Sequence, residues 1–154
     1  MADTKAVQKV SELKRIEQRW GKALADAGWT AFPSTILAYQ KRLGLSALDL
    51  NIVLQIAQHW WDPEKHAFPS KARIAAAIGV KPRSVQRRIA AMEAAGLIER
   101  VYRRKASGVN QTNVYKLNGL ARKAEKYAHE VLAERAAKKK ADAERNKPRL
   151  QRVK

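Results

Sequence analysis

The sequence contains no cysteine, and several other residue types that mark particular protein classes are sparse. Its 154 residues include 7 Gly, 5 Pro, 2 Met and 2 Phe. Without cysteine the chain forms no disulfide and uses no thiolate chemistry. No apolar run approaches the roughly 20 residues of a membrane-spanning helix, and the first residues lack the apolar core of a secretory signal. We therefore expect a soluble, intracellular protein with at most one modest domain plus appendages.

Acidic residues are also scarce relative to basic ones. The chain has 14 Asp and Glu against 32 Lys and Arg, which gives a formal net charge of +18. Such a surplus favours a polyanionic partner, because a basic surface releases the counterions condensed on nucleic acid. The charge is segregated: residues 45–70 carry one Lys and three acids, whereas residues 71–105 carry ten Lys or Arg and two Glu. The basic part is therefore the expected binding surface.

Residue types that support catalysis occur here without a recognisable arrangement. The sequence has no Gly-rich phosphate-binding loop, and no Ser/His/Asp set or carboxylate pair stands in an identifiable context. Four candidate metal ligands lie close together, but their spacing matches no established zinc pattern and Pro63 predicts a turn that separates them. We therefore expect no enzyme, metal or cofactor. The four residues are His59, Asp62, Glu64 and His66.

Residues 70–96 have the pattern of two short helices joined by a tight turn. Ser70 suits the cap of a first helix that carries two isoleucines one turn apart. Gly79 suits the turn, because glycine adopts a positive φ without strain. Pro82 fits the first turn of a second helix, which ends at Gly96. This is the pattern of a helix-turn-helix.

The second helix has an apolar stripe, formed by Val85, Ile89 and Met92, and an opposite polar face. The polar residues lie near the N-terminus, where a recognition helix meets base edges. Arg can bridge guanine O6 and N7, Gln can pair with adenine, and Ser can bond a base or a phosphate. An ordinary amphipathic helix with a solvated basic face is the alternative. The candidate base contacts are Arg83, Ser84, Gln86 and Arg87; the candidate backbone contacts beside them are Ser70, Lys71, Arg73, Lys81 and Arg88.

A hairpin is predicted after the second helix. Ile98 and Val101 alternate with polar neighbours, as in a strand, and residues 114–117 return as a second strand. A basic tip on such a hairpin can straddle a phosphate backbone or enter a minor groove. A plain surface hairpin explains the strands equally well, but not the cluster of charge. The candidate backbone contacts in this segment are Arg103, Arg104, Lys105, Asn110 and Gln111.

Together these motifs resemble the winged helix-turn-helix domains of bacterial, phage and plasmid DNA-binding regulators and replication proteins. The resemblance covers residues 28–120 and implies a mainly α fold with a small β-hairpin wing. It also implies binding of double-stranded DNA in the bacterial cytoplasm, at the nucleoid, through the four base-contact candidates. Lys81-Pro82 departs from the pattern, since many relatives carry a small polar residue there. The matching runs begin at Pro69, Gly79, Gly96 and Asn113, and upstream at Gly28, Leu43 and His59.

An apolar stripe runs along residues 6–27, which predicts an amphipathic helix closed by Gly28. The stripe needs a partner, either the rest of the chain or a second copy. Residues 29–33 predict an extended segment that adds an edge strand to the hairpin's sheet. The stripe consists of Val10, Leu13, Ile16, Trp20 and Leu24.

Two further helices are expected before the helix-turn-helix. Ser34 is predicted to cap a helix that runs through Arg42 and stops near Gly44. Ser46 and Asp49 form a variant of the capping box ahead of the most apolar helix, which we expect at the centre of the fold. The aromatic residues after it are interpreted as packing residues rather than as a stacking platform for single strands. They are Trp60, Trp61 and Phe68.

A helix is predicted over residues 120–137, with a short coiled-coil rhythm. This rhythm suits either a dimer, which would place two reading heads about one DNA turn apart, or packing against the N-terminal helix. The rhythm is formed by Leu120, Ala124, Tyr127, Val131 and Glu134.

The last segment, residues 138–154, carries eight Lys or Arg against two acids and scarcely any apolar residue. This composition predicts a disordered tail that grips phosphates without regard to sequence. The candidate phosphate contacts are Lys138, Lys139, Lys140, Arg145, Lys147, Arg149 and Arg152.

The sequence thus predicts four segments, and three functions fit them. A sequence-specific DNA-binding regulator of transcription is favoured. A plasmid or phage replication or partition factor that binds origin repeats, and a non-specific architectural or RNA-binding protein, are the alternatives. The expected partners are double-stranded DNA, a second copy through the terminal helices, and the transcription or replication machinery. The segments are an N-terminal amphipathic helix (1–28), a winged helix-turn-helix domain (29–119), a C-terminal helix (120–137) and a basic tail (138–154).

Overall fold

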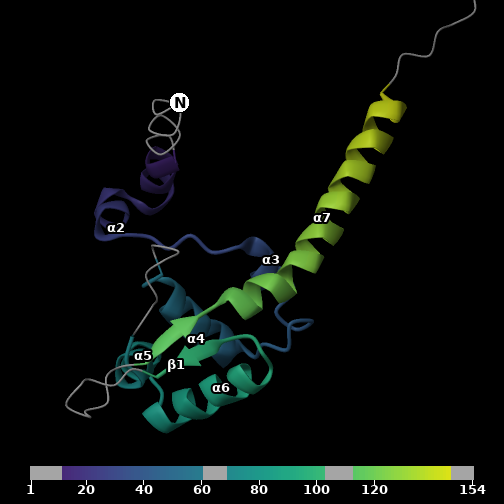
Figure 1. Ribbon diagram of the computed structural model, residues 1–154. Coiled ribbons are helices and arrows are strands. Elements are labelled where there is room, and N and C mark those ends of the chain that lie inside the picture. The colour runs from purple at the N-terminus through teal and green to yellow at the C-terminus, as the bar shows by residue number, and fades with distance from the viewer. Residues whose placement is uncertain (1–11, 61–68, 103–112, 147–154) are drawn as a thin grey trace, which may run out of the picture. The chain divides into compact units, whose positions relative to one another are not determined.

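The computed structural model describes residues 12–60, 69–102 and 113–146. The chain divides into two compact units, residues 1–32 and residues 33–154. Within the described ranges it is mainly helical, with one two-stranded antiparallel sheet (Figure 1). The expected fold class, a mainly α winged helix-turn-helix, is confirmed.

The first unit contains a broken helix. Residues 12–20 are helical and α2 (Lys22–Ala27) follows, but between them Gly21 leaves the helical conformation with a φ of 85°. The prediction of one uninterrupted helix up to Ala27 is therefore wrong. The apolar periodicity passes through Gly21, yet glycine is a poor helix residue by about 1 kcal/mol and tolerates the positive φ of the break.

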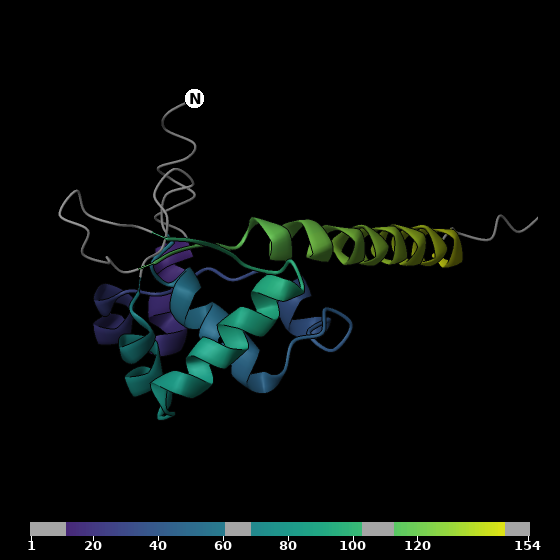
Figure 2. The same cartoon turned by 60° about the horizontal axis from the view of Figure 1, so that its bottom comes forward.

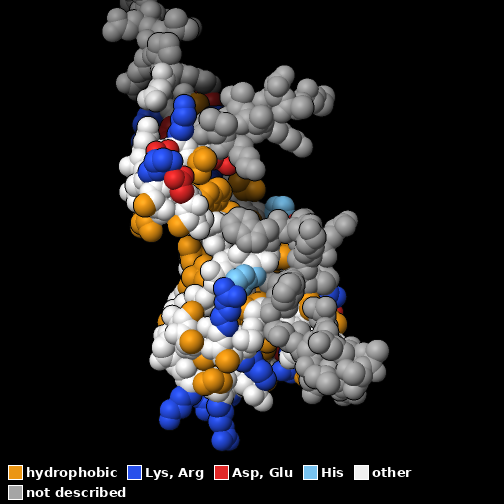
Figure 3. Space-filling model, turned by 90° about the vertical axis from the view of Figure 1, so that its left-hand side faces the viewer, with side chains coloured by type: hydrophobic (Ala, Val, Ile, Leu, Met, Phe, Trp, Pro, Cys, Tyr) orange, Lys and Arg blue, Asp and Glu red, His pale blue; other side chains and the backbone are white. Residues whose placement is uncertain are grey.

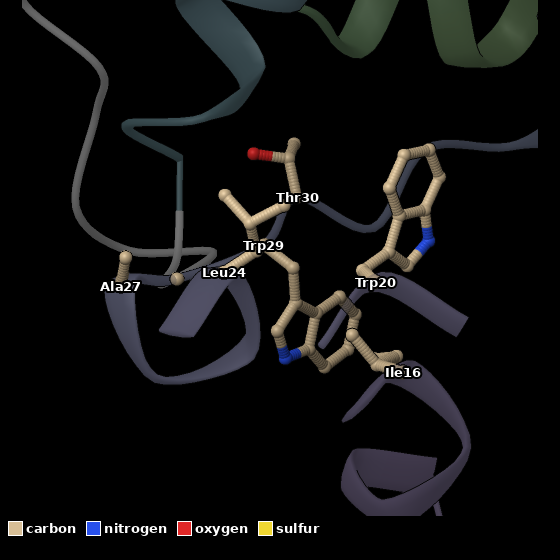
Figure 4. A pocket seen from close by; sticks show the side chains of 7 residues that line it. Ile16, Trp20, Leu24, Ala27, Trp29 and Thr30 are labelled. Atoms are coloured by element: carbon tan, nitrogen blue, oxygen red, sulfur yellow. The ribbon is translucent and has the colours of Figure 1, made fainter. Parts of the chain in front are cut away.

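The apolar stripe of this unit stays largely open to solvent. Trp20 is 68% exposed and Leu24 is 59% exposed. Trp20, Leu24, Ile16 and Trp29 border a hollow. The Trp29 ring lies beside Ile16, and the Trp20 ring points away from Ile16 (Figure 4). Residues 29–33 form no strand, since β1 and β2 are the only strands in the described part of the chain. The predicted edge strand is therefore wrong.

The second unit begins with a short helix, α3 (Ser34–Ala38). Pro33 occupies the N-cap position, so Ser34 is the first helical residue and not the cap that the sequence suggested. The helix also ends before Arg42, and turns continue to Gly44. These turns carry Leu43 and Leu45 into the core, at 8% and 5% exposure, so tertiary packing overrides the local helical signal.

Helix α4 (Ala47–Ala57) lies at the centre of the second unit, as expected. The predicted capping box is present, because the Ser46 side chain accepts from the Asp49 backbone N–H and the Asp49 carboxylate accepts from the Ser46 backbone N–H. Three α4 side chains, Ile52, Val53 and Ile56, are 0% exposed. The cap fixes where this core helix starts.

The helix-turn-helix consists of α5 (Lys71–Ile78) and α6 (Pro82–Ala94), and both helices pack against α4. The Ser70 hydroxyl accepts from the Arg73 backbone N–H at 3.1 Å and caps α5. Gly79 ends α5 in the left-handed conformation, with a φ of 79°. Pro82 is the first residue of α6. These predicted boundary signals are all confirmed.

Two short strands follow, β1 (Glu99–Val101) and β2 (Val114–Lys116). They pair antiparallel with Arg100 opposite Tyr115, which confirms the predicted pairing. Val114 and Tyr115 are buried, so the sheet is anchored to the core. The segment between the strands lies outside the described residues from position 103 to 112.

One long helix, α7 (Asn118–Arg145), extends from the end of β2. It continues through residues 138–145, so the prediction of a disordered tail from Lys138 is wrong for that part. Ala, Lys, Glu and Arg have high helix propensity, and a helix already nucleated upstream propagates through them without apolar contacts. Residues 147–154 lie outside the described ranges.

The start of α7 packs on its own chain. Leu120, Ala124 and Tyr127 are buried, at 1%, 6% and 5% exposure. The Tyr127 ring stacks on Tyr39, with the ring centres 5.1 Å apart and the planes 4° from parallel. Three positions of the predicted coiled-coil rhythm are therefore occupied within the chain and are not available as a seam for a second copy.

Candidate nucleic-acid interface

Helix α6 has one buried face and one exposed face, and α5 lies beside its first turns (Figure 2). The predicted apolar stripe is confirmed, since Val85 and Ile89 are 0% exposed and Met92 is 2% exposed. The stripe fixes the rotation of the helix about its axis and turns the polar side outward. Of the four candidate base contacts, Ser84 is half-buried and the other three are exposed: Arg83, Gln86 and Arg87.

Both helices of the motif begin with basic residues. Lys71 and Arg73 lie in the first turn of α5, Lys81 is the N-cap of α6, and Arg83 is the second residue of α6; neither first turn contains an acid. The N-terminus of a helix carries partial positive charge, so a cation there costs about 0.3–1 kcal/mol. Helix α4 follows the usual rule, with Asp49 in its first turn. An anion bound at the start of α5 and α6 would relieve this repulsion.

The charge of this region has a single sign. Residues 71–92 contain six Lys or Arg and no Asp or Glu. Lys and Arg side chains project together from the lower end of the face in Figure 3, where Figure 1 places α5 and the start of α6. Such a surface attracts a polyanion over a range of about 10 Å at moderate salt.

A polar contact connects the two helices at this surface. The Lys71 ammonium donates to the side-chain oxygen of Gln86 at 3.3 Å. Lys71 was a candidate for the DNA backbone and Gln86 a candidate for a base edge. The structure brings them together, so the orientation of Gln86 depends on α5 as well as on α6.

Arg88, a further backbone candidate, is directed toward the interior. Its Nε donates to Asp49 Oδ1 at 2.7 Å and its Nη2 to Oδ2 at 2.5 Å. Burial alone would raise the pKa of Asp49, which is 0% exposed, but hydrogen bonds from Arg88 and Ser46 outweigh it and hold the pKa below its ordinary value. We therefore assign Arg88 to the support of α6, in place of the DNA-backbone role that the sequence suggested.

A second support for α6 was not found from the sequence. The Lys123 ammonium of α7 donates to the Ala95 carbonyl at the end of α6, where a cation is favourable. Beside it, a Cβ on Gly119 would lie 2.2 Å from the Gly96 carbonyl oxygen. Because glycine has no Cβ, the first turn of α7 can lie against the Gly96 carbonyl. No local pattern connects residues so far apart in sequence.

The other predicted contacts divide into described and undescribed residues. Ser70 uses its oxygen as the cap of α5 and stays exposed at the surface. Four tail candidates are exposed on α7: Lys138, Lys139, Lys140 and Arg145. Eight candidates lie outside the described residues, five from the predicted hairpin tip (Arg103, Arg104, Lys105, Asn110 and Gln111) and three from the predicted tail (Lys147, Arg149 and Arg152).

The described ranges contain no cluster of three or more His, Asp or Glu side chains suited to a metal ion. Asp62, Glu64 and His66 lie outside these ranges, together with Trp61 and Phe68. No described helix is both long enough and apolar enough to cross a membrane.

Comparison with known proteins identifies the central part of the chain. A family model described as a helix-turn-helix domain matches residues 43–98, which run from the turns before α4 to the start of the sheet. No curated protein sequence matches. A solved structure described as a possible transcriptional regulator from Methanosarcina mazei Go1 is similar over 72% of this chain and 88% of its own, at 16% identity and a TM-score of 0.44. Residues 43–98 of this chain are therefore similar to a helix-turn-helix domain.

Proposed function

We propose that this protein is a sequence-specific double-stranded DNA-binding protein that regulates transcription, acting by binding and not by catalysis. The observation that carries the proposal is the pair of helix starts, α5 and α6, which are basic where helices normally prefer acids. A sequence that accepts this repulsion gains from an anionic partner. The DNA phosphate backbone is the anion that a helix-turn-helix meets.

In this proposal α6 enters the major groove and reads base edges with Arg83, Gln86 and Arg87. Arg73 and the other basic residues at the helix starts hold the flanking phosphates and fix the register. The hairpin tip and the basic end of the chain add phosphate contacts that raise affinity without adding sequence information. A protein of this kind acts at the DNA, in the bacterial cytoplasm.

A homodimer through the first unit is part of the proposal. The first unit exposes Trp20 and Leu24, and such an apolar surface suits a contact with a second copy. Two heads related by a twofold axis would bind half-sites about 34 Å apart, so a palindromic target is expected.

Selection of bound fragments from a random duplex library at physiological salt tests the proposal. The wild-type chain is expected to enrich a motif, and Arg83→Ala/Arg87→Ala is expected to lose it. Lys138→Ala/Lys139→Ala is the matched control, because it removes the same charge from exposed residues of α7 and should weaken binding while keeping the motif. Equal retention of all sequences by the wild type would contradict the proposal and favour the architectural alternative.

A second candidate function, a replication or partition factor at origin repeats, is favoured by one observation. The open apolar surface around Trp20 and Trp29 is suited to recruiting another protein. Trp20→Ala distinguishes the two functions. A recruiting factor would keep its DNA affinity and lose replication of a plasmid that carries its site, whereas a regulator would leave plasmid copy number unchanged.

A further inference from the structure

The three exposed side chains on the reading face of α6 offer hydrogen-bond donors to DNA. Arg83 and Arg87 carry only donors, because a guanidinium has five N–H groups and no acceptor. Gln86 alone has both a donor and an acceptor. Its orientation therefore decides whether this face reads a mixed pattern or an acceptor-only pattern.

The contact with Lys71 fixes the orientation of Gln86. An ammonium group has three donors and no acceptor, so its partner at 3.3 Å is the amide oxygen and not the amide nitrogen. The Gln86 oxygen is thus held toward α5, and the NH₂ group is the part of the amide left for a base edge. A bidentate pair with adenine needs the oxygen to face the adenine N6 donor. Lys71 holds that oxygen and places a cation beside it.

We propose that Lys71 is a specificity-determining positioning residue, and that the site read by Arg83, Gln86 and Arg87 is rich in guanine on one strand. Guanine presents two acceptors, O6 and N7, in the major groove, whereas adenine presents one acceptor and one donor, thymine one acceptor beside a methyl group, and cytosine a donor. Arg83 and Arg87 are four residues apart, on the order of 6 Å along the helix, which corresponds to about two base pairs of DNA. The donors therefore face two or three successive pairs. This inference rests on the proposed function.

The test compares four full-length variants with wild type in the same random duplex selection. Gln86→Ala identifies the base position that Gln86 reads, as the position that loses its preference. Wild type is expected to select guanine there. Lys71→Met frees the Gln86 amide to pair with adenine, so the guanine-to-adenine ratio should fall roughly tenfold, toward one. Arg73→Met is the matched control, since it removes one charge from the same helix without touching Gln86. Arg73→Met should weaken binding to every duplex and leave the guanine-to-adenine ratio at the Gln86 position unchanged. Arg87→Ala should lose guanine at a neighbouring position.

Base analogues at the Gln86 position show which acceptors are read. Replacing guanine by 7-deazaguanine removes the N7 acceptor and is expected to weaken wild-type binding several-fold. Inosine keeps O6 and N7 and lacks only the minor-groove amino group, so it should bind like guanine. Weakened binding to inosine would place the contact in the minor groove and overturn the inference.

The outcomes separate the inference from the proposed function. A wild-type motif with adenine, thymine or cytosine at the Gln86 position, or a ratio unchanged in Lys71→Met, would overturn the role of Lys71 and leave a sequence-specific DNA-binding protein. The absence of any wild-type motif would overturn the proposed function itself. Lys71 and Gln86 lie at the surface, and equal urea midpoints of the variants would show that none of these results reflects unfolding.

Discussion

Arg88→Ala is expected to lower the free energy of unfolding by about 2–4 kcal/mol, because it leaves a buried carboxylate without its cation. Removing one partner of a fully buried ion pair costs roughly 3–5 kcal/mol. Asp49 is 0% exposed, but the Arg88 side chain is 33% exposed and Ser46 still donates two hydrogen bonds to the carboxylate. Because of this exposure and these remaining hydrogen bonds, the expected loss in the free energy of unfolding is smaller than that for a fully buried pair.

The same pair makes stability depend on pH. The pKa of Asp49 is lower in the folded protein than in the unfolded chain, where it has its ordinary value near 4. The ion pair therefore stabilises the fold fully above the unfolded pKa, and this contribution is lost as the pH falls through the folded pKa. The difference in stability between wild type and Arg88→Ala should narrow as the pH falls below about 4.

Urea unfolding followed by circular dichroism measures both effects. Arg87→Ala is the matched control, since it removes the neighbouring, exposed arginine of the same helix and should change stability by less than about 0.5 kcal/mol. The reasoning is refuted if Arg88→Ala unfolds like wild type and instead reduces the slope of log affinity against log salt by about 1. That result would return Arg88 to the phosphate backbone.

Three further substitutions probe the supports of the fold. Gly119→Ala should destabilise the protein by about 1–3 kcal/mol, because its Cβ would meet the Gly96 carbonyl at 2.2 Å; an unchanged melting temperature would contradict this packing. Tyr127→Ala removes a ring that is 5% exposed and stacked on Tyr39, so urea unfolding should show a free energy of unfolding lower by about 3 kcal/mol. A decrease below about 1 kcal/mol would mean that α7 does not pack there. Ser46→Ala removes the cap of α4 and a hydroxyl donor to Asp49, so calorimetry should find a free energy of unfolding lower by about 1–2 kcal/mol. A stability equal to wild type would show that the capping box is not formed in solution.

The helix-turn-helix was predictable because its signals act between close neighbours. Ser70 caps the helix three residues ahead, Gly79 closes the helix behind it, and Pro82 starts the next one. The apolar stripe of α6 repeats within a single helix, so its buried face could also be read from spacing. Such features need no knowledge of the rest of the fold.

Other boundaries depended on distant parts of the chain. Helix α3 stops early because the following turns deliver Leu43 and Leu45 to the core, which no local pattern announces. The end of α7 differs from the prediction for another reason. A lack of apolar residues predicts disorder, but the residues at the end of α7 are strong helix formers.

Within the candidate site, the sequence identified the polar residues but not their partners. Arg88 and its partner Asp49 are 39 residues apart, and the pairing depends on how α6 crosses α4. Lys71 and Gln86 were both singled out, yet the orientation of the amide follows from the packing of α5 on α6. The residue type determines which hydrogen bonds a side chain can make, whereas the direction of each donor depends on how the helices pack.

The continuity of α7 determines how freely the basic residues in its last turns can move. From Glu130 to Arg145 the helix spans about 22 Å at 1.5 Å per residue, beyond the part anchored by Leu120, Ala124 and Tyr127. A flexible tail would let the basic residues at 138–145 sample many distances, with an effective concentration set by chain statistics. A rigid rod holds them at one distance from its anchor, so that inserting a single residue would turn them by about 100° around the axis.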